Sequence, residues 1–339
     1  MLTHHQIAAA TRIGMLTRER DTASACAQAL CELSDALPLD AAALLAIDPL
    51  TGVHTQLAGI GYTAETSQSM AAEFVTTPWY GSAVRQELPP SICEDDENAG
   101  PRFRHGWFYA ERVRPAGFRD GVTGGLRRGA RVVGLVHLAT QSADVYHTEA
   151  RRLLASVIPA LAVLADPLAH TGDQHGLADE GAAALVTPEG GVVDLPGRDR
   201  PRVLRDEEFH GVLRTFAGTD GLRLRMLWPV DGAWYRVSLH RHRASLCAAK
   251  RVVLVHETSV EPPYGLSRRE LEVLTRAATG QTNRAIAQTL FLSPRTVHSH
   301  IEHLLRKTGC ASRAEATALA VRDGLLRPAA DDLLFFVER

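Results

Sequence analysis

The sequence lacks most features that mark secreted, disulfide-rich or membrane proteins. Its five cysteines in 339 residues show neither the close pairs of a zinc site nor the density of a disulfide scaffold. The N-terminal segment MLTHHQIAAATRIG has no basic start followed by an apolar core, and no run of about eighteen apolar residues occurs anywhere. We therefore expect a cytoplasmic protein with reduced thiols and no membrane segment.

Catalytic and metal-binding motifs are missing as well. The GxSxG, GxxxxGK and HExxH patterns do not occur, so the sequence predicts neither an enzyme nor a cofactor. Histidines recur in two places, His240 with His242 and a group at 298, 300 and 303. On a helix only His300 and His303 would share a side, and no Cys or acid completes a four-ligand set, so we predict no metal site.

Lysine is nearly absent, and positive charge is unevenly placed. Residues 265–327 hold ten Arg or Lys against five Asp or Glu, whereas the whole chain carries a net charge of −2. A region with a net charge of +5 attracts a polyanion, and its binding to nucleic acid should weaken steeply with salt.

Residues 265–326 contain the start and stop signals of four short helices. Ser267 with Glu270 forms a capping box, and Ser293 followed by Pro294 is typical of a helix start. The helix that begins at Ser293 has one apolar stripe, made of Val297, Ile301, Leu304 and Leu305. Its other face is polar and carries Arg295, His298, Ser299, Glu302 and Arg306. With the preceding helix, Asn283–Leu290, the spacing predicts a helix-turn-helix whose second helix enters the major groove of DNA.

This segment resembles the LuxR-type (GerE-like) transcription regulators. The matching residues are Leu266-Ser267, Arg269-Glu270-Leu271-Glu272-Val273-Leu274, Gly280, Asn283, Ile286-Ala287, Leu292-Ser293, Arg295-Thr296-Val297, His300, Lys307, Gly309, Ser312-Arg313 and Glu315-Ala316. Agreement of so many positions in register is far more specific than one short motif.

The resemblance implies roles for individual side chains. It assigns base contacts to His298, Ser299 and Glu302, and phosphate contacts to Arg295, Thr296 and Lys307, while Arg306 on the same face is expected to reach DNA as well. Relatives often have Lys or Arg at positions 298 and 302. Because Glu accepts from the cytosine amino group but cannot bind guanine as Arg does, the preferred DNA sequence does not follow by analogy.

The N-terminal part of the chain has the pattern of an α+β domain. A helix over Asp21–Leu37 precedes a strand at Ala41–Ile47 and a second strand from Val53, and a hairpin near 117–139 precedes a helix at Thr148–Ala165. This order predicts a sheet with helices on one side. It resembles a GAF domain, in which a small ligand, a chromophore or a partner occupies the space between the sheet and the middle segment.

That middle segment, residues 64–115, is rich in aromatic residues. The candidate ligand-binding side chains are Trp79, Tyr80, Trp107, Phe108 and Tyr109, to which Phe103 adds another ring. Such rings would suit an apolar or planar ligand. The alternative is that they form the ordinary core beneath a long connection.

A second α+β unit, which looks like a degenerate PAS domain, separates the two. We expect a GAF-like sensor domain at residues 1–168, a PAS-like relay domain at 178–258 and a LuxR-type domain at 264–328. Pro262-Pro263 stiffens the last junction.

The predicted function is that of a bacterial transcription regulator that senses a small molecule. Its expected partners are double-stranded DNA, a second copy of the chain in a homodimer and RNA polymerase. The fourth helix, with Ala314, Ala318 and Val321 exposed, would join the two protomers. In the alternative, the N-terminal region is an interaction module and a partner protein controls the same DNA-binding domain without any ligand.

Overall fold

The structure is a computed structural model that describes all residues except 1–2, 20, 96–101, 179, 243–250 and 339. The described residues fall into two compact units that divide after Ala169. Each unit has its own sheet and its own hydrophobic core.

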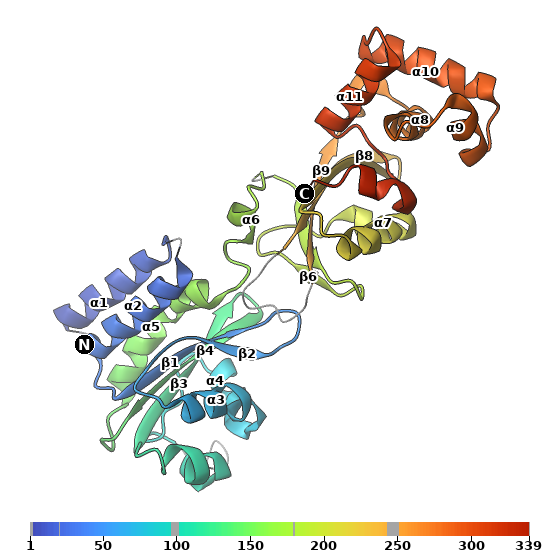
Figure 1. Cartoon of the computed structure of the whole chain (residues 1–339). Helices are drawn as coiled ribbons and strands as arrows, with labels where there is room; N and C mark the ends of the chain where they lie inside the picture. The colour runs from blue at the N-terminus through green and yellow to red at the C-terminus, as the bar shows by residue number, and fades with distance from the viewer. Residues whose placement is uncertain (1–2, 20, 96–101, 179, 243–250, 339) are drawn as a thin grey trace. The chain divides into compact units, whose positions relative to one another are not determined.

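The first unit is built on a four-stranded antiparallel sheet (Figure 1). The strands follow the order β2-β1-β4-β3. The helices are α1 (His4–Leu16), α2 (Thr22–Ala36), α3 (Ala64–Ala72), α4 (Pro78–Arg85) and α5 (Thr148–Ala165), and the strands are β1 (Ala41–Ile47), β2 (His54–Ile60), β3 (Asp120–Arg128) and β4 (Arg131–Thr140). This is the predicted order of elements, with the additional helices α1, α3 and α4 that the sequence analysis missed. The α+β fold class is confirmed.

Helices cover both faces of this sheet, so the prediction of helices on one side was wrong. Ala42 and Leu44 of β1 pack in a core with α1, α2 and α5. The alternate residues of the same strand, Ala43 and Leu45, pack with α3, α4 and the rest of the middle segment. Successive side chains of a strand point to opposite faces. The continuous apolar run of β1 therefore signals a strand that is buried on both sides.

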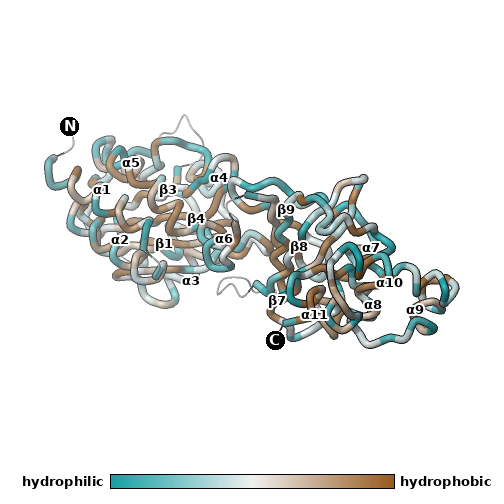
Figure 2. Tube along the Cα trace, turned by 90° about the horizontal axis from the view of Figure 1, so that it is seen from above, coloured by the Kyte–Doolittle hydropathy of each residue, from teal (hydrophilic) through white to brown (hydrophobic). Residues whose placement is uncertain are grey.

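The second unit contains a five-stranded antiparallel sheet followed by four helices. The strand order is β6-β5-β9-β8-β7. Its elements are α6 (Thr171–Gln174), β5 (Ala182–Val186), β6 (Val192–Asp194), α7 (Glu207–Gly218), β7 (Arg223–Val230), β8 (Ala233–Arg241), β9 (Val253–Val260), α8 (Arg268–Ala278), α9 (Asn283–Thr289), α10 (Pro294–Thr308) and α11 (Arg313–Asp323). In both units, hydrophobic stretches of the chain are interspersed with hydrophilic ones (Figure 2).

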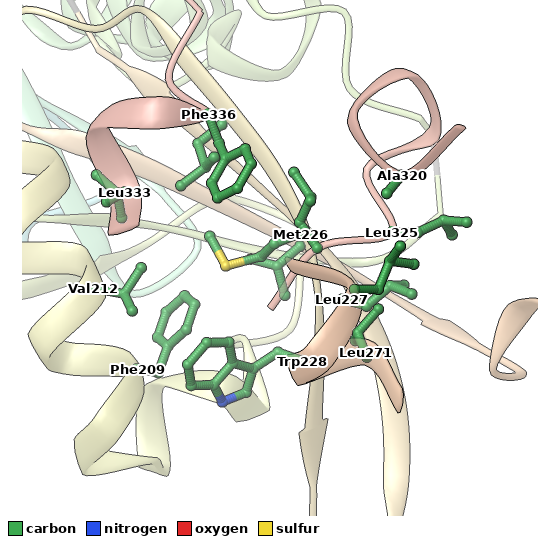
Figure 3. Packing of buried hydrophobic residues seen from close by; sticks show 14 of the residues in the cluster. Phe209, Val212, Met226, Leu227, Trp228, Leu271, Ala320, Leu325, Leu333 and Phe336 are labelled. Atoms are coloured by element: carbon green, nitrogen blue, oxygen red, sulfur yellow. The ribbon is translucent and has the colours of Figure 1, made fainter. Parts of the chain in front are cut away.

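One hydrophobic core joins the second sheet to the four C-terminal helices. Phe209 of α7 and Trp228 of β7 lie on one side of this core (Figure 3). On the other side Leu227 lies near Leu271 of α8 and Leu325, which follows α11 (Figure 3). The division of this region into a relay domain and a DNA-binding domain stays a prediction, because the two share buried side chains.

Candidate functional site

Helix α10 begins and ends where the local sequence dictates. The Ser293 hydroxyl accepts a hydrogen bond from the Thr296 N–H at 3.0 Å, and Pro294 occupies the first turn. Gly309 ends the helix in the left-handed conformation, with φ of 72°. Val297, Ile301 and Leu304 are buried in the core shared with α8 and α11, and Leu305 is half-buried. The predicted apolar stripe therefore fixes which side of α10 faces water.

The opposite side of α10 is open to solvent. The exposed predicted contacts are Arg295, Thr296, His298, Glu302, Arg306 and Lys307, and Ser299 is half-buried. His298 Nε2 lies 3.3 Å from Glu302 Oε1, and both side chains are 63 % exposed. Because both side chains are exposed, water can replace this contact and leave either group free to bind elsewhere.

Lys307 is engaged within the protein. Its Nζ donates to the Glu270 carboxylate at 2.6 Å and to the Gly265 carbonyl oxygen at 2.8 Å. Burial raises the pKa of Glu270, but hydrogen bonds from Lys307 and Ser267 outweigh it, so the net pKa lies below the usual value. Lys307 thus ties the end of α10 to the start of α8, and its contact with phosphate stays a prediction.

Helix α9 adds side chains that the sequence analysis did not select. Arg284 and Gln288 are exposed on it, and the first helix of a helix-turn-helix crosses the DNA backbone. Arg313 holds this helix in place by donating to the Asn283 side-chain oxygen at 3.0 Å. The sequence offered one signal for them: Arg284 and Gln288 are polar and flank the apolar residues Ile286 and Ala287.

The small residues expected to join two protomers are accessible on α11. Ala314, Ala318 and Val321 are exposed, whereas Ala316 and Ala320 are buried. Helix α11 therefore packs on the core with one side and exposes Ala314, Ala318 and Val321 on the other.

The first unit contains a cavity between its sheet and the middle segment. The volume open to the centres of water molecules is about 70 Å³, enough for several waters, since one needs about 10–15 Å³. The lining is mostly apolar and consists of Tyr62, Thr66, Met70, Phe74, Trp79, Ala83, Pro90, Ser91, Ile92, Asp95, Phe103, Arg112, Val113, Phe118, Gly121, Val122, Thr123, Leu138 and Ala139.

Of the five aromatic candidates, Trp79 lines this cavity and the other four do not. Phe108 is fully buried against Phe74 instead, with ring centroids 5.6 Å apart. Tyr80 packs on His54 at 5.7 Å, and Trp107 is 41 % exposed. Tyr109 packs on Phe103 at 6.0 Å. Tyr80, Trp107, Phe108 and Tyr109 therefore stay predictions as ligand contacts, because composition reveals aromatic content but not the direction of each ring.

Polar groups without partners lie in or beside the cavity wall. The Tyr62 hydroxyl and His137 Nε2 are buried and have no hydrogen-bond partner among the described residues. Burial raises the pKa of Tyr62. Burial, with a smaller contribution from His54, lowers the pKa of His137 to about 3. Both groups are therefore neutral near pH 7, and the Tyr62 hydroxyl can bond a polar group that enters the cavity.

Within the described ranges, no three His, Cys, Asp or Glu side chains are arranged to hold a metal ion. None of the helices among these described residues has the length and hydropathy needed to cross a bilayer.

The family model "Bacterial regulatory proteins, luxR family" matches residues 265–320. The chain is 43 % identical over 70 residues to the uncharacterized transcriptional regulatory protein YhcZ of Bacillus subtilis, covering 21 % of this chain and 33 % of that protein. It is 49 % identical over 61 residues to the probable transcriptional regulatory protein NarL of Mycobacterium tuberculosis, covering 18 % of this chain and 28 % of that protein. The chain thus spans about a third or less of these relatives.

Similar solved structures include the GAF domain of a phosphoenolpyruvate-protein phosphotransferase from Coxiella burnetii. Its TM-score is 0.39 at 16 % identity, with 52 % of this chain and 100 % of that chain covered. For Escherichia coli SdiA the TM-score is 0.36 at 15 % identity, with 95 % of this chain and 99 % of that chain covered. Because both scores are low, the assignment of the DNA-binding end depends on the sequence matches and the helical geometry. The chain carries, at residues 265–320, a helix-turn-helix domain of the luxR family of bacterial regulatory proteins.

Proposed function

We propose that this protein is a transcription regulator that binds duplex DNA through helix α10. The observation that carries the proposal is the exposed polar face of α10 on a helix whose other face is buried. A helix of this kind fits the major groove, where side chains at its N-terminal half meet base edges. Arg295 and Thr296 would bind phosphates, and His298, Ser299 and Glu302 would read bases.

The protein would bind as a homodimer to a site with two-fold symmetry. The exposed small residues of α11 allow two copies of that helix to approach closely, and a two-fold axis there would present two copies of α10 to successive major grooves. Half-sites should then lie about one helical turn of DNA apart.

Glu302→Ala should change which DNA sequence the protein prefers. A carboxylate can accept from the cytosine amino group, and each good base contact is worth about 1–3 kcal/mol of discrimination. Binding-site selection from random duplexes measures this preference. The control is Glu189→Ala, an exposed carboxylate in the turn before β6. If Glu302→Ala and Glu189→Ala select the same sequence as the unchanged protein, Glu302 does not read a base.

The first unit, in the same proposal, is a sensor for a small molecule with an apolar body and one hydrogen-bonding group. The cavity between the sheet and the middle segment supports this, because its wall is apolar except for a few polar groups such as the Tyr62 hydroxyl. Binding sites for small molecules combine these two features.

Native mass spectrometry of the freshly purified full chain should detect a bound molecule, and Ala83→Leu should abolish it. Ala83 lines the cavity and is 1 % exposed, so a larger side chain there fills space the ligand would occupy. Ala110→Leu, on an exposed position of the same segment, is the matched control and should keep the adduct. Absence of any adduct, or its survival in Ala83→Leu, favours the alternative in which this unit docks a partner protein.

A further inference from the structure

The helix-turn-helix domain is attached to the second sheet at both of its ends. At one end β9 leads through Pro262 and Pro263 into α8. At the other end α11 is followed by residues 324–338, which return to the sheet. We name residues 324–338 the strap.

The strap pairs with the free edge of the sheet through its backbone. The Leu227 N–H donates to the Leu326 carbonyl oxygen at 2.9 Å, and the Glu338 N–H donates to the Arg223 carbonyl oxygen at 2.8 Å. Strand β7 is the last strand in the sheet order, so the strap covers hydrogen-bonding groups that an edge strand leaves unpaired. Gly324 allows the approach, since its φ is +66° and a Cβ there would lie 3.1 Å from Arg225 Cβ.

Apolar side chains of the strap complete the core between the sheet and the helices. Leu325, Leu326 and Leu333 are no more than 2 % exposed. Leu333 and Phe336 lie on the side of Met226 and Val212, whereas Leu325 lies beside Leu227 and Leu271 (Figure 3). Removing the strap would therefore open the core on both sides of β7.

Arg327 is the polar centre of the strap. Its side chain is 5 % exposed and pairs with Glu208 of α7 at 2.6 Å and with Glu272 of α8 at 3.4 Å. Its guanidinium carbon lies 4.5 Å from the ring centroid of Trp228, a cation–π contact. Arg327 thus bonds to α7, α8 and β7 together. A second ion pair, Arg276 with Asp332 at 3.1 Å, repeats the connection between α8 and the strap.

We propose that the strap is a releasable lock that sets the orientation of the helix-turn-helix domain on the second sheet. While the strap is in place, bending at Pro262-Pro263 cannot turn the domain, because its other end is fixed to the same sheet. Glu208 and Glu338 are each 48 % exposed, so water can replace the ion pair of Glu208 with Arg327 and that of Glu338 with Arg225. Opening the strap also uncovers Leu325, Leu326 and Leu333, so it is a local unfolding event of the strap and the helices that leaves β8 and β9 paired. The lock fixes the orientation of the helix-turn-helix domain relative to the second sheet. It does not cover the polar face of α10, which stays exposed.

Hydrogen exchange of the full chain, followed by mass spectrometry without DNA, tests the lock independently of the proposed function. Arg327→Ala should speed exchange in α8, α9 and α11 by about tenfold or more, the factor that corresponds to losing one charge-assisted hydrogen bond, while β8 and β9 keep their protection. Glu272 retains Arg268 and Arg269 as partners, so the variant leaves no unpaired acid at that position. Asp332→Asn, which weakens the second ion pair, should act in the same direction.

Arg322→Ala is the matched control, because Arg322 is 71 % exposed and its side chain pairs with the neighbouring Asp323. The proposal is overturned if Arg327→Ala exchanges like Arg322→Ala, which would mean that other contacts hold the domain. It is also overturned if exchange rises equally in the helices and in β8 and β9, which would mean that the two cannot separate.

Discussion

Asp120→Ala is expected to lower the free energy of unfolding of the first unit by about 6 kcal/mol or more, because its carboxylate accepts four hydrogen bonds and each bond to a charged group is worth about 1.5–3 kcal/mol. The Asp120 side chain is completely buried. Its carboxylate accepts from backbone N–H groups at 2.8–3.0 Å, those of Cys93, Gly121, Val145 and Tyr146. Alanine would take this acceptor from all four N–H groups, of which Gly121 and Tyr146 belong to buried residues. The carboxylate thus joins Cys93 of the middle segment, the start of β3 and the turn before α5.

Differential scanning calorimetry of the full chain measures the effect. A loss of this much free energy of unfolding should lower the midpoint temperature of the first unit's unfolding transition by about 10 °C or more. Asp35→Ala, at an exposed position of α2, removes the same charge and should leave the transition within about 2 °C. Asp120→Asn should fall between the two, because its amide keeps one acceptor oxygen but turns N–H groups toward donors. A transition for Asp120→Ala equal to that of Asp35→Ala would contradict the structural role of the carboxylate.

The double variant Arg295→Ala, Arg306→Ala should bind duplex DNA about a hundredfold more weakly, since each charge-assisted contact with a phosphate is worth about 1.5 kcal/mol. Both guanidinium groups are exposed on α10, and neither forms an ion pair within the described ranges of the chain. They are therefore available to phosphates without first giving up an internal partner. The loss should be equal for the selected sequence and for a scrambled one, because phosphate contacts carry no base information.

Fluorescence anisotropy at several salt concentrations separates this effect from misfolding. The slope of log affinity against log salt should become shallower by about 2, or about 0.9 for each phosphate that the variant no longer neutralises. Arg18→Ala, Arg214→Ala removes two exposed arginines outside α10 and changes net charge equally, so it should leave the slope almost unchanged. If the α10 variant keeps the original slope, helix α10 does not lie against the phosphates.

The helix-turn-helix was predictable because its signals are local. The cap at Ser293, the proline after it and the apolar residues of α10 lie within a few turns of one helix, and their spacing alone decides which side is buried. The same holds for α5, whose observed bounds, Thr148–Ala165, equal the predicted ones. The apolar face of such a helix and the turn residues at its ends are enough to predict it without knowledge of the rest of the fold.

The cavity residues were not predictable because they come from segments far apart in the sequence. Tyr62 follows β2, Phe118 precedes β3, and Leu138 belongs to β4. Which ring points into the space and which fills the core depends on how α3, α4 and the segment near 103–113 pack on the sheet. The aromatic content of residues 64–115 therefore predicted where the cavity lies and one of its lining residues, Trp79. It did not predict the other residues of the cavity wall.

The sequence by itself determined the four C-terminal helices, the strands of the first sheet and the family of the DNA-binding domain, because these follow from periodicity, caps and residue identity within short windows. Only the tertiary structure decided that Lys307 is held by Glu270, that helices cover both faces of the first sheet and that Arg327 joins α8 to α7 and to Trp228 of β7. Each of these depends on residues brought together from distant positions in the sequence. Burial determines how much an ion pair or an apolar face contributes to stability, and burial arises only when the chain has packed.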